Sequence, residues 1–217
     1  MLLRTLVTTA IVGAAVASPV AFRPAAPLNA GAPVAMATFT VDASHSQVLF
    51  KVRHLGISTV TGRFGTFSGT FQLDPASGQA GAASMSIDVA SINTDNERRN
   101  GHLKSPDFFA ADSFPKITFA STGIQKVSGN TYKVSGNLTM RGVTKPVVLD
   151  AEVAGTRQTA EGWLAAVNMS GTVKRKDYGL MWDRVTEGVA VVSDEITLLI
   201  EVEAKAPCKR QPVKRIV

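Results

Sequence analysis

The sequence has little of several features from which catalytic and metal sites are built. It contains a single cysteine, Cys208, which excludes an internal disulfide bond and any zinc site made of several cysteines. Its three histidines lack the close spacings of common metal sites, such as HxH or HExxH, and the GxSxG motif of a nucleophilic serine is missing. Tryptophan and tyrosine, the rings that sugar- and base-binding sites favour, occur only twice each. No metal site or cofactor is therefore predicted.

Acidic residues are missing from both ends of the chain. Residues 1–37 carry two basic residues and no acid, and residues 205–217 carry five basic residues and no acid. The region between them, 38–204, keeps 16 of the 23 basic residues and all 17 acidic ones, so its net charge is −1, although the whole chain has +6. A nucleic-acid partner is not expected, because it needs a basic face on the folded domain. The tail over 205–217 is predicted to be disordered, with transient contact to anionic membrane lipid as the alternative.

Long hydrophobic runs are absent apart from one near the N-terminus. Residues 1–17 have one basic residue followed by an apolar stretch that is shorter than the about 20 residues of a membrane-spanning helix. This pattern is typical of a secretory signal peptide, and small-residue cleavage patterns end at Ala17 and at Ala37. An uncleaved membrane anchor is the alternative. Residues 1–37 are interpreted as a signal peptide with a Pro/Ala-rich leader, and the protein as periplasmic or secreted.

The remaining chain is dominated by alternation of apolar and polar residues, which indicates half-buried β-strands. Turn-forming dipeptides such as Arg141-Gly142 and Glu161-Gly162 separate several of these stretches. A polar segment, 93–103, is predicted to hold a helical turn, and Ser105-Pro106 is typical of a helix start. The fold class is all-β, and periodicity alone leaves a closed barrel and a two-sheet sandwich equally open. The alternation covers residues 47–54, 66–74, 83–89, 116–123, 131–140, 143–153, 162–173 and 195–204.

Histidine and arginine side chains are the candidates for polar chemistry. His54 is in phase with the apolar face of its strand, and Arg99 and His102 are three residues apart, which places them on one face of a helical turn. These three residues are predicted to meet a polar or anionic head group at the mouth of a pocket. The rival hypothesis is an enzyme acting on an exported lipid or small molecule through His45, His54 or His102 with a carboxylate such as Asp42.

Five segments of the sequence together resemble the YceI-like family of exported proteins. The resemblance covers residues 39–204 in order, with one departure at Asn100, where similar proteins often have Asp. It implies an extended, lipocalin-like barrel of eight antiparallel strands in the bacterial periplasm, which binds a long isoprenoid chain, such as a quinone tail or a prenyl phosphate, and often forms a homodimer. The segments are FTVDASHSQVLFKVRHLGISTVTGRFGTFSG, ASINTDNERRNGHLKSPDFFAADSFPKITFAST, GNLTMRGVTKPVVLD, RKDYGLMWD and VVSDEITLLIEVEA.

The apolar faces of the strands are then the expected lining of the ligand tunnel, in a barrel domain spanning 38–204. Burial contributes about 0.8 kcal/mol per methylene, so each five-carbon prenyl unit contributes roughly 3 kcal/mol. The sequence therefore predicts a lipid carrier with a bound isoprenoid and no catalytic step, and a ligand-free protein with a packed core is a third alternative. The lining residues are predicted to be Phe50, Val52, Phe67, Phe71, Ile87, Phe119, Leu138, Met140, Leu149 and Met169.

Overall fold

A computed structural model describes residues 36–186 and 188–207 of the chain. The predicted signal peptide and leader, apart from residues 36 and 37, and Cys208 lie outside the described residues. No helix in the described part has the length and apolar character needed to cross a bilayer. The elements of this part are β1 (Ala37–His54), β2 (Ser58–Phe64), β3 (Phe67–Leu73), β4 (Ala80–Asp88), the 3-10 helix η1 (Val89–Ser91), β5 (Ile92–Asn93), α1 (Glu97–Lys104), β6 (Lys116–Ser128), β7 (Thr131–Met140), β8 (Val143–Thr159), β9 (Gly162–Lys174), the 3-10 helix η2 (Arg175–Tyr178), β10 (Val185–Thr186), β11 (Val189–Ala190) and β12 (Val192–Pro207).

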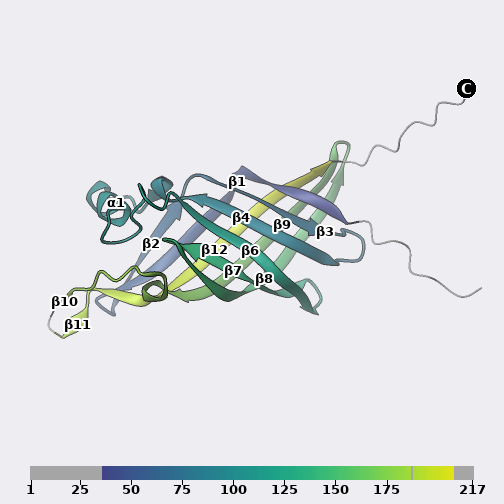
Figure 1. Cartoon of the computed structure of the whole chain (residues 1–217). Helices are drawn as coiled ribbons and strands as arrows, with labels where there is room; N and C mark the ends of the chain where they lie inside the picture. Colours follow the sequence, from purple (N-terminus) through teal and green to yellow (C-terminus); the bar gives the residue numbers. More distant parts are fainter. Residues whose placement is uncertain (1–35, 187, 208–217) are drawn as a thin grey trace, which may run out of the picture. The chain divides into compact units, whose positions relative to one another are not determined.

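Eight of the strands form a closed antiparallel barrel (Figure 1). The hydrogen-bonded order is β1-β3-β4-β6-β7-β8-β9-β12, and β12 pairs back onto β1, so the ring has no free edge. These eight strands correspond to the eight stretches of alternating residues in the sequence. The barrel predicted from the family resemblance is thus confirmed, and the sandwich alternative is excluded.

The hairpin between β7 and β8 shows how the sequence directs this arrangement. Tyr132, Val134, Leu138 and Met140 are buried on one face of β7, while the residues between them are mostly exposed or half-buried. The strand then reverses through Arg141-Gly142, whose φ angles are 50° and 75°. Two successive positive φ values are the requirement of a two-residue type I′ turn, which matches the twist of antiparallel strands. Pairing therefore continues directly from Met140 to Val143.

The first strand is longer than predicted because, along the edge opposite β12, it pairs with two strands in succession. Residues 37–40 of β1 pair with β3, and residues 48–54 pair with β2, which the alternation in the sequence did not reveal. The last strand is also longer, since β12 continues to Pro207, and Lys205 pairs in register with both Thr40 and Leu164. The boundary predicted between the barrel and a tail at 205 therefore lies too early.

The connection between β5 and β6 contains one helix, α1. The sequence predicts a helical turn within 93–103 and a second helix beginning at Ser105. Ser105 is the C-cap of α1, and its backbone N–H donates to His102 O at 3.1 Å. The chain then makes a single turn, because Ala110 adopts a positive φ of 48° and its N–H donates back to Ser105 O. The helix predicted to begin at Ser105 is thus wrong, although the Ser105 hydroxyl does accept a hydrogen bond from the Asp107 N–H.

Helix α1 and the β10–β11 hairpin lie at the same end of the barrel (Figure 1). The loop that follows α1 is attached to the β7–β8 turn, where Arg141 donates to Phe108 O at 2.5 Å. It is attached to the β10–β11 side by the Phe108 and Trp182 rings, whose centroids are 5.3 Å apart. We call the residues 97–115, 175–186 and 188–192 the cap. The opposite end, where β1 begins and β12 ends, is called the far end.

Candidate ligand-binding site

The capped half of the barrel encloses a cavity of about 140 Å³. An engineered cavity of about 150 Å³ with a similar apolar lining stays dry and binds benzene, so a space of this size favours an apolar molecule over water. Arg175 is the one residue with a polar side chain among the described residues that line the cavity. The others are Val48, Leu49, Phe50, Val52, Phe64, Met85, Ile87, Leu103, Phe108, Phe109, Ile117, Phe119, Leu138, Met140, Val147, Leu149, Met169, Val173, Leu180, Val192, Ile196, Leu198 and Ile200.

Several side chains on the cavity wall are only half-buried although they point into the barrel. This group includes Phe50, Phe119, Val147 and Ile196. Their uncovered apolar surface faces the cavity rather than another side chain. A core filled by its own side chains would cover this surface, because protein interiors pack as densely as organic crystals. The interior of the capped half is therefore incompletely filled.

The cap closes one end of this cavity with apolar side chains. Leu103 comes from α1, Phe108 and Phe109 from the loop after it, and Leu180 from the segment after η2. The Phe109 ring packs edge-on against Phe64 of β2, with the ring centroids 6.1 Å apart. The cap is thus an apolar lid whose inner surface continues the lining of the barrel.

Arg175 connects Leu180 and Trp182 of the cap with the start of β12. Its side chain is 3% exposed, and the guanidinium donates to Ser193 O at 3.0 Å, Leu180 O at 2.6 Å and Trp182 O at 2.7 Å. A fourth, longer bond reaches Val192 O at 3.4 Å. A buried charge without such partners would be strongly unfavourable. Arg175 therefore holds these backbone segments together, which the sequence did not predict because its acceptors are backbone carbonyls.

A second, smaller cavity of about 70 Å³ lies next to the first, on the side that faces the far end. Its walls include Phe71, Tyr132 and Val153, and Tyr132 donates through its hydroxyl to Gly78 O at 2.6 Å. Closer to the far end the interior is filled. There Phe39 stacks on Phe71 with the ring centroids 5.2 Å apart, and Ala204 is fully buried.

The structure places nine of the ten side chains predicted to line a tunnel on the walls of these cavities. Phe71 lines the smaller cavity, and Phe119 and Met169 line both. Phe67 differs, since it is 9% exposed and packs within the core cluster without lining either cavity. Contact of these residues with a ligand stays a prediction. The remaining wall residues of the ten are Phe50, Val52, Ile87, Leu138, Met140 and Leu149.

The three residues predicted to meet a head group do not line the cavities that the structure describes. The Arg99 side chain donates to Thr94 Oγ1 at 2.8 Å and to Thr94 O at 2.7 Å. Asn100, the departure from the family pattern, accepts two further bonds from Thr94, at 2.8 Å from its N–H and 2.7 Å from its hydroxyl. Arg99 and Asn100 thus anchor the residue that leads into α1.

His102 and His54 lie at the capped end without joining Arg99. The His102 Nε2 is 3.0 Å from Asp107 Oδ2, and its ring contacts the Phe108 and Trp182 rings edge-on. His54 is half-buried at the end of β1. The structure therefore does not bring Arg99 and His102 together through a shared partner, and contact of either residue with a head group stays a prediction. Arg99 and His102 do have the three-residue spacing of neighbours on one helix face, but each side chain has its own partner.

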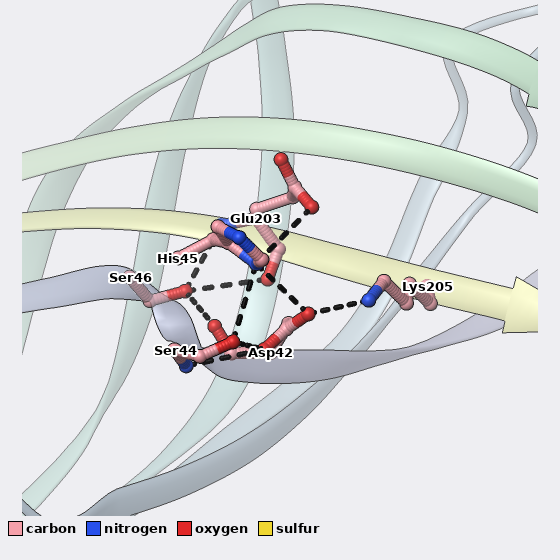
Figure 2. A network of polar contacts seen from close by, with 6 residues as sticks. All are labelled: Asp42, Ser44, His45, Ser46, Glu203 and Lys205. Carbon is pink, nitrogen blue, oxygen red and sulfur yellow. Dashed lines mark hydrogen bonds and ion pairs between the residues drawn. The ribbon is translucent and has the colours of Figure 1, made fainter.

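Two residues of the rival enzyme hypothesis, His45 and Asp42, meet in a bulge of β1, whereas His54 and His102 lie elsewhere (Figure 2). Between Asp42 and Gln47 the strand holds more residues than the facing part of β12, so the ladder is interrupted. The Ser46 hydroxyl bridges the gap, donating to Asp42 O at 2.6 Å and accepting from the Glu203 N–H at 3.0 Å. The cluster thus replaces backbone bonds that the bulge removes.

The geometry around His45 does not match a nucleophilic triad. Asp42 Oδ2 lies 3.1 Å and Ser44 Oγ 3.2 Å from the same ring nitrogen, Nδ1. A triad needs the carboxylate on one nitrogen and the hydroxyl on the other, so that the ring can transfer the proton. His45 is also 62% exposed and on the outside of the barrel wall. Ser44 and Asp42 therefore share one ring nitrogen of His45, which differs from the arrangement of a catalytic triad.

Asp42 accepts hydrogen bonds from several members of this cluster. Lys205 donates to Asp42 Oδ2 at 2.5 Å, and this ammonium, with further hydrogen bonds from Ser44 and His45, holds the pKa of Asp42 well below its usual range. The ligand atoms of Asp42, His45 and Glu203 lie within 4.8 Å of one another. However, the Lys205 ammonium already occupies the Asp42 oxygen that a cation would need. The cluster is therefore explained as a polar support of the bulge.

The fold and the cavity together define a class of protein: a closed eight-stranded antiparallel barrel with a capped, apolar interior. The sequence profile of the YceI-like domain matches residues 39–204. The chain belongs to this family. The resemblance seen in the five sequence segments is confirmed over the same residues.

Relatives of known sequence and structure agree with this membership. A UPF0312 protein of Pectobacterium atrosepticum is 35% identical over 166 residues, which cover 76% of this chain and 83% of the relative. Protein YceI of Salmonella arizonae is 35% identical over 165 residues, covering 75% and 82%.

Solved structures show the same barrel. A Campylobacter jejuni YceI protein superposes with a TM-score of 0.63 at 37% identity, covering 71% of this chain and 90% of that one. BcnA of Burkholderia cenocepacia superposes with a TM-score of 0.66 at 28% identity, covering 76% and 99%. A polyisoprenoid binding domain from Saccharophagus degradans, at 20% identity and a TM-score of 0.57 over 79% and 99%, shares the fold.

Proposed function

We propose that this chain is an exported lipid-binding protein that sequesters or carries an isoprenoid chain, of the quinone-tail or prenyl-phosphate type, in the barrel interior. The observation that carries the proposal is the cavity of the capped half, whose lining is apolar except for Arg175. The proposal places the protein in the periplasm or outside the cell, on the basis of the signal-like residues 1–37. It includes no catalytic step, because the ligand is held by burial alone.

The energetics favour a flexible hydrocarbon as the ligand. A cavity with apolar walls offers few hydrogen bonds to a polar molecule, whose buried groups would then lose their water without replacement. A hydrocarbon has no hydrogen bonds to water to lose, and each buried methylene contributes about 0.8 kcal/mol to binding. Micromolar binding needs about 8 kcal/mol, which corresponds to about three prenyl units before the cost of ordering the chain.

The name of one structural neighbour points to the same ligand class. The Saccharophagus degradans domain is described as polyisoprenoid binding, and it shares the barrel with this chain. That likeness concerns the fold, so the ligand of this chain rests on its own cavity. Arg175 faces this cavity, and its positive charge makes a negatively charged or strongly polar head group at the cap more favourable than a cationic one.

The test begins with the lipid that the protein acquires in a cell. The exported protein is purified, extracted with organic solvent, and the extract is analysed by mass spectrometry. We expect an unmodified isoprenoid in about stoichiometric amount. An empty extract, together with no binding of added farnesol by calorimetry, would contradict the proposal and support a ligand-free protein.

A cavity-filling variant shows where the lipid lies. Ile196→Phe adds volume inside the large cavity, and we expect it to weaken farnesol binding by about tenfold, or 1.4 kcal/mol. Thr197→Phe is the matched control, because Thr197 is the next residue of β12 and is exposed. Equal loss in both variants, or in neither, would show that farnesol does not occupy this cavity.

The enzyme hypothesis is separated from the carrier hypothesis by the fate of the lipid. A carrier returns the lipid unchanged, and His45→Ala, His54→Ala and His102→Ala leave this result unaltered. Modification of the lipid that disappears in one of these variants would establish the enzyme instead. The proposal also includes a homodimer and transient membrane contact, which are measured by light scattering and by co-sedimentation with anionic vesicles.

A further inference from the structure

The two cavities of the barrel share three wall residues, Met85, Phe119 and Met169. Met85 on β4 pairs directly with Phe119 on β6. Met169 comes from β9, which is separated from β6 by β7 and β8 in the ring. These side chains therefore reach the boundary from two different parts of the barrel wall. We call the three residues the partition.

The partition is made of side chains that change conformation at low cost. The two methionines are unbranched and have three rotatable bonds, so they adapt readily to a new neighbour. All three side chains are half-buried, since part of their surface faces one cavity or the other. None is held by a polar contact, because none carries a polar group. Rearrangement therefore breaks only dispersion contacts, which individually are weak.

The Phe119 ring rests against Gly136 of the neighbouring strand β7. A Cβ atom built on Gly136 would lie 2.4 Å from Cζ of Phe119, which is closer than any real contact. The absence of a side chain at Gly136 thus provides the space that this ring occupies. In this conformation the Phe119 ring thus uses the space above Gly136 of β7.

The size of the large cavity makes this partition important. At about 140 Å³ it matches a cavity that holds benzene, which has six carbons and is little larger than one prenyl unit. One unit contributes roughly 3 kcal/mol, which is less than the about 4 kcal/mol of millimolar binding. Micromolar binding of about three units therefore requires more space than the large cavity offers by itself.

We propose that Met85, Phe119 and Met169 move aside to join the two cavities into one channel, and that Phe119 determines the length of isoprenoid chain that the protein accepts. This inference rests on the proposed function. The channel ends at the stacked rings of Phe39 and Phe71, beyond which the interior is filled. A chain that enters from the cap therefore passes the partition first and stops at this stack.

The experiment measures how affinity depends on chain length. Lipid-free full-length protein is titrated with geraniol, farnesol and geranylgeraniol, which have two, three and four prenyl units. In the wild type we expect the gain in affinity per unit to fall at the length that reaches the partition. Phe119→Ala removes the largest side chain of the partition, and we expect it to tighten geranylgeraniol binding by about tenfold while geraniol binding changes by less than about threefold.

Two further variants each change the volume of only one cavity. Val147→Ala enlarges the large cavity alone and is expected to change the affinities for short and long chains alike. Ala83→Leu fills the smaller cavity alone and is expected to weaken only the longest chain. Far-UV circular dichroism and the melting temperature establish that each variant is folded.

The outcomes separate this inference from the proposed function. Absence of binding by the wild type at every chain length would contradict the proposed function itself. Normal binding by the wild type, with the same length dependence in Phe119→Ala and in Ala83→Leu, would leave the proposed function standing and overturn the partition. A parallel shift at all lengths in Phe119→Ala would equally overturn it, because the residue would then act only as part of the wall.

Discussion

The two ends of the barrel are built from the same alternating strands, yet the far end is filled around Phe39 and Ala204, whereas the capped half encloses the larger of the two cavities. At the far end, Phe39 and Ala204 are fully buried, and large rings pack in one cluster with several alanines. In the capped half, β2 and β5 extend one side of the wall, and the cap completes the closure with side chains that only line the interior. The difference teaches that alternation defines which residues face inward, whereas the sizes of facing residues decide whether the interior is filled.

The largest expected effect comes from removing a ring at the filled end. Phe39→Ala should lower the free energy of unfolding by about 3–5 kcal/mol, because the ring is completely surrounded and leaves an unfilled space. For a chain of this size that corresponds to a melting temperature lower by roughly 10 °C or more. Phe50→Ala in the capped half should cost about half as much, since the Phe50 ring already borders the cavity. Equal decreases in melting temperature for Phe39→Ala and Phe50→Ala would contradict the difference in packing between these two regions.

A smaller effect is expected from the polar contacts that hold the cap. Arg175→Met keeps the apolar stem but removes the donors to Leu180 O, Trp182 O and Ser193 O. Each buried acceptor left without a partner costs about 1–3 kcal/mol, reduced where water enters, so we expect a loss of about 2–3 kcal/mol in unfolding free energy. Lys176→Met, which removes the exposed pair with Asp183, is the control and should have little effect. An unchanged melting temperature in Arg175→Met would show that the cap does not depend on this residue.

The smallest effect concerns the bulge on the outside of the barrel and depends on pH. Lys205, Ser44 and His45 lower the pKa of Asp42, so its ionised form contributes stability that is complete above the unfolded pKa of about 3.9. This contribution is lost as the pH falls from that value toward the lower folded pKa. We therefore expect Asp42→Asn to melt a few degrees below the wild type at pH 7 and the difference to shrink below about pH 4. Asp150→Asn, which removes an exposed ion pair with Lys133, is the control. A difference that stays constant with pH would contradict this account of Asp42.

Local patterns in the sequence were sufficient for the strands and most turns. The predicted range of β7, 131–140, coincides with the structure, because its alternation and both flanking turns are local features. Strand β2 was missed, since Ser58–Phe64 contains only one large apolar residue, Val60, besides Phe64 and is defined by its pairing with β1. The end of β12 was placed too early because the Lys205 partner, Asp42, is distant in the sequence.

The site was only partly predictable, because local patterns do not reveal every contact that forms it. Inward faces follow from strand periodicity, and they identified most of the cavity walls. The bonds of Arg175 to backbone carbonyls and of Arg99 to Thr94 depend on how loops fold back, which residue type does not reveal. The partition depends on Gly136, whose role appears only when the Phe119 ring is placed beside it.

The central claim is that the capped half contains an empty apolar space and the far end does not. Crystals of the protein pressurised with xenon test it directly, because xenon enters empty apolar cavities. The account predicts xenon between the cap and Phe119, and none between Phe39 and Ala204. Xenon-free density throughout the capped half, in crystals where xenon binds elsewhere, would contradict it.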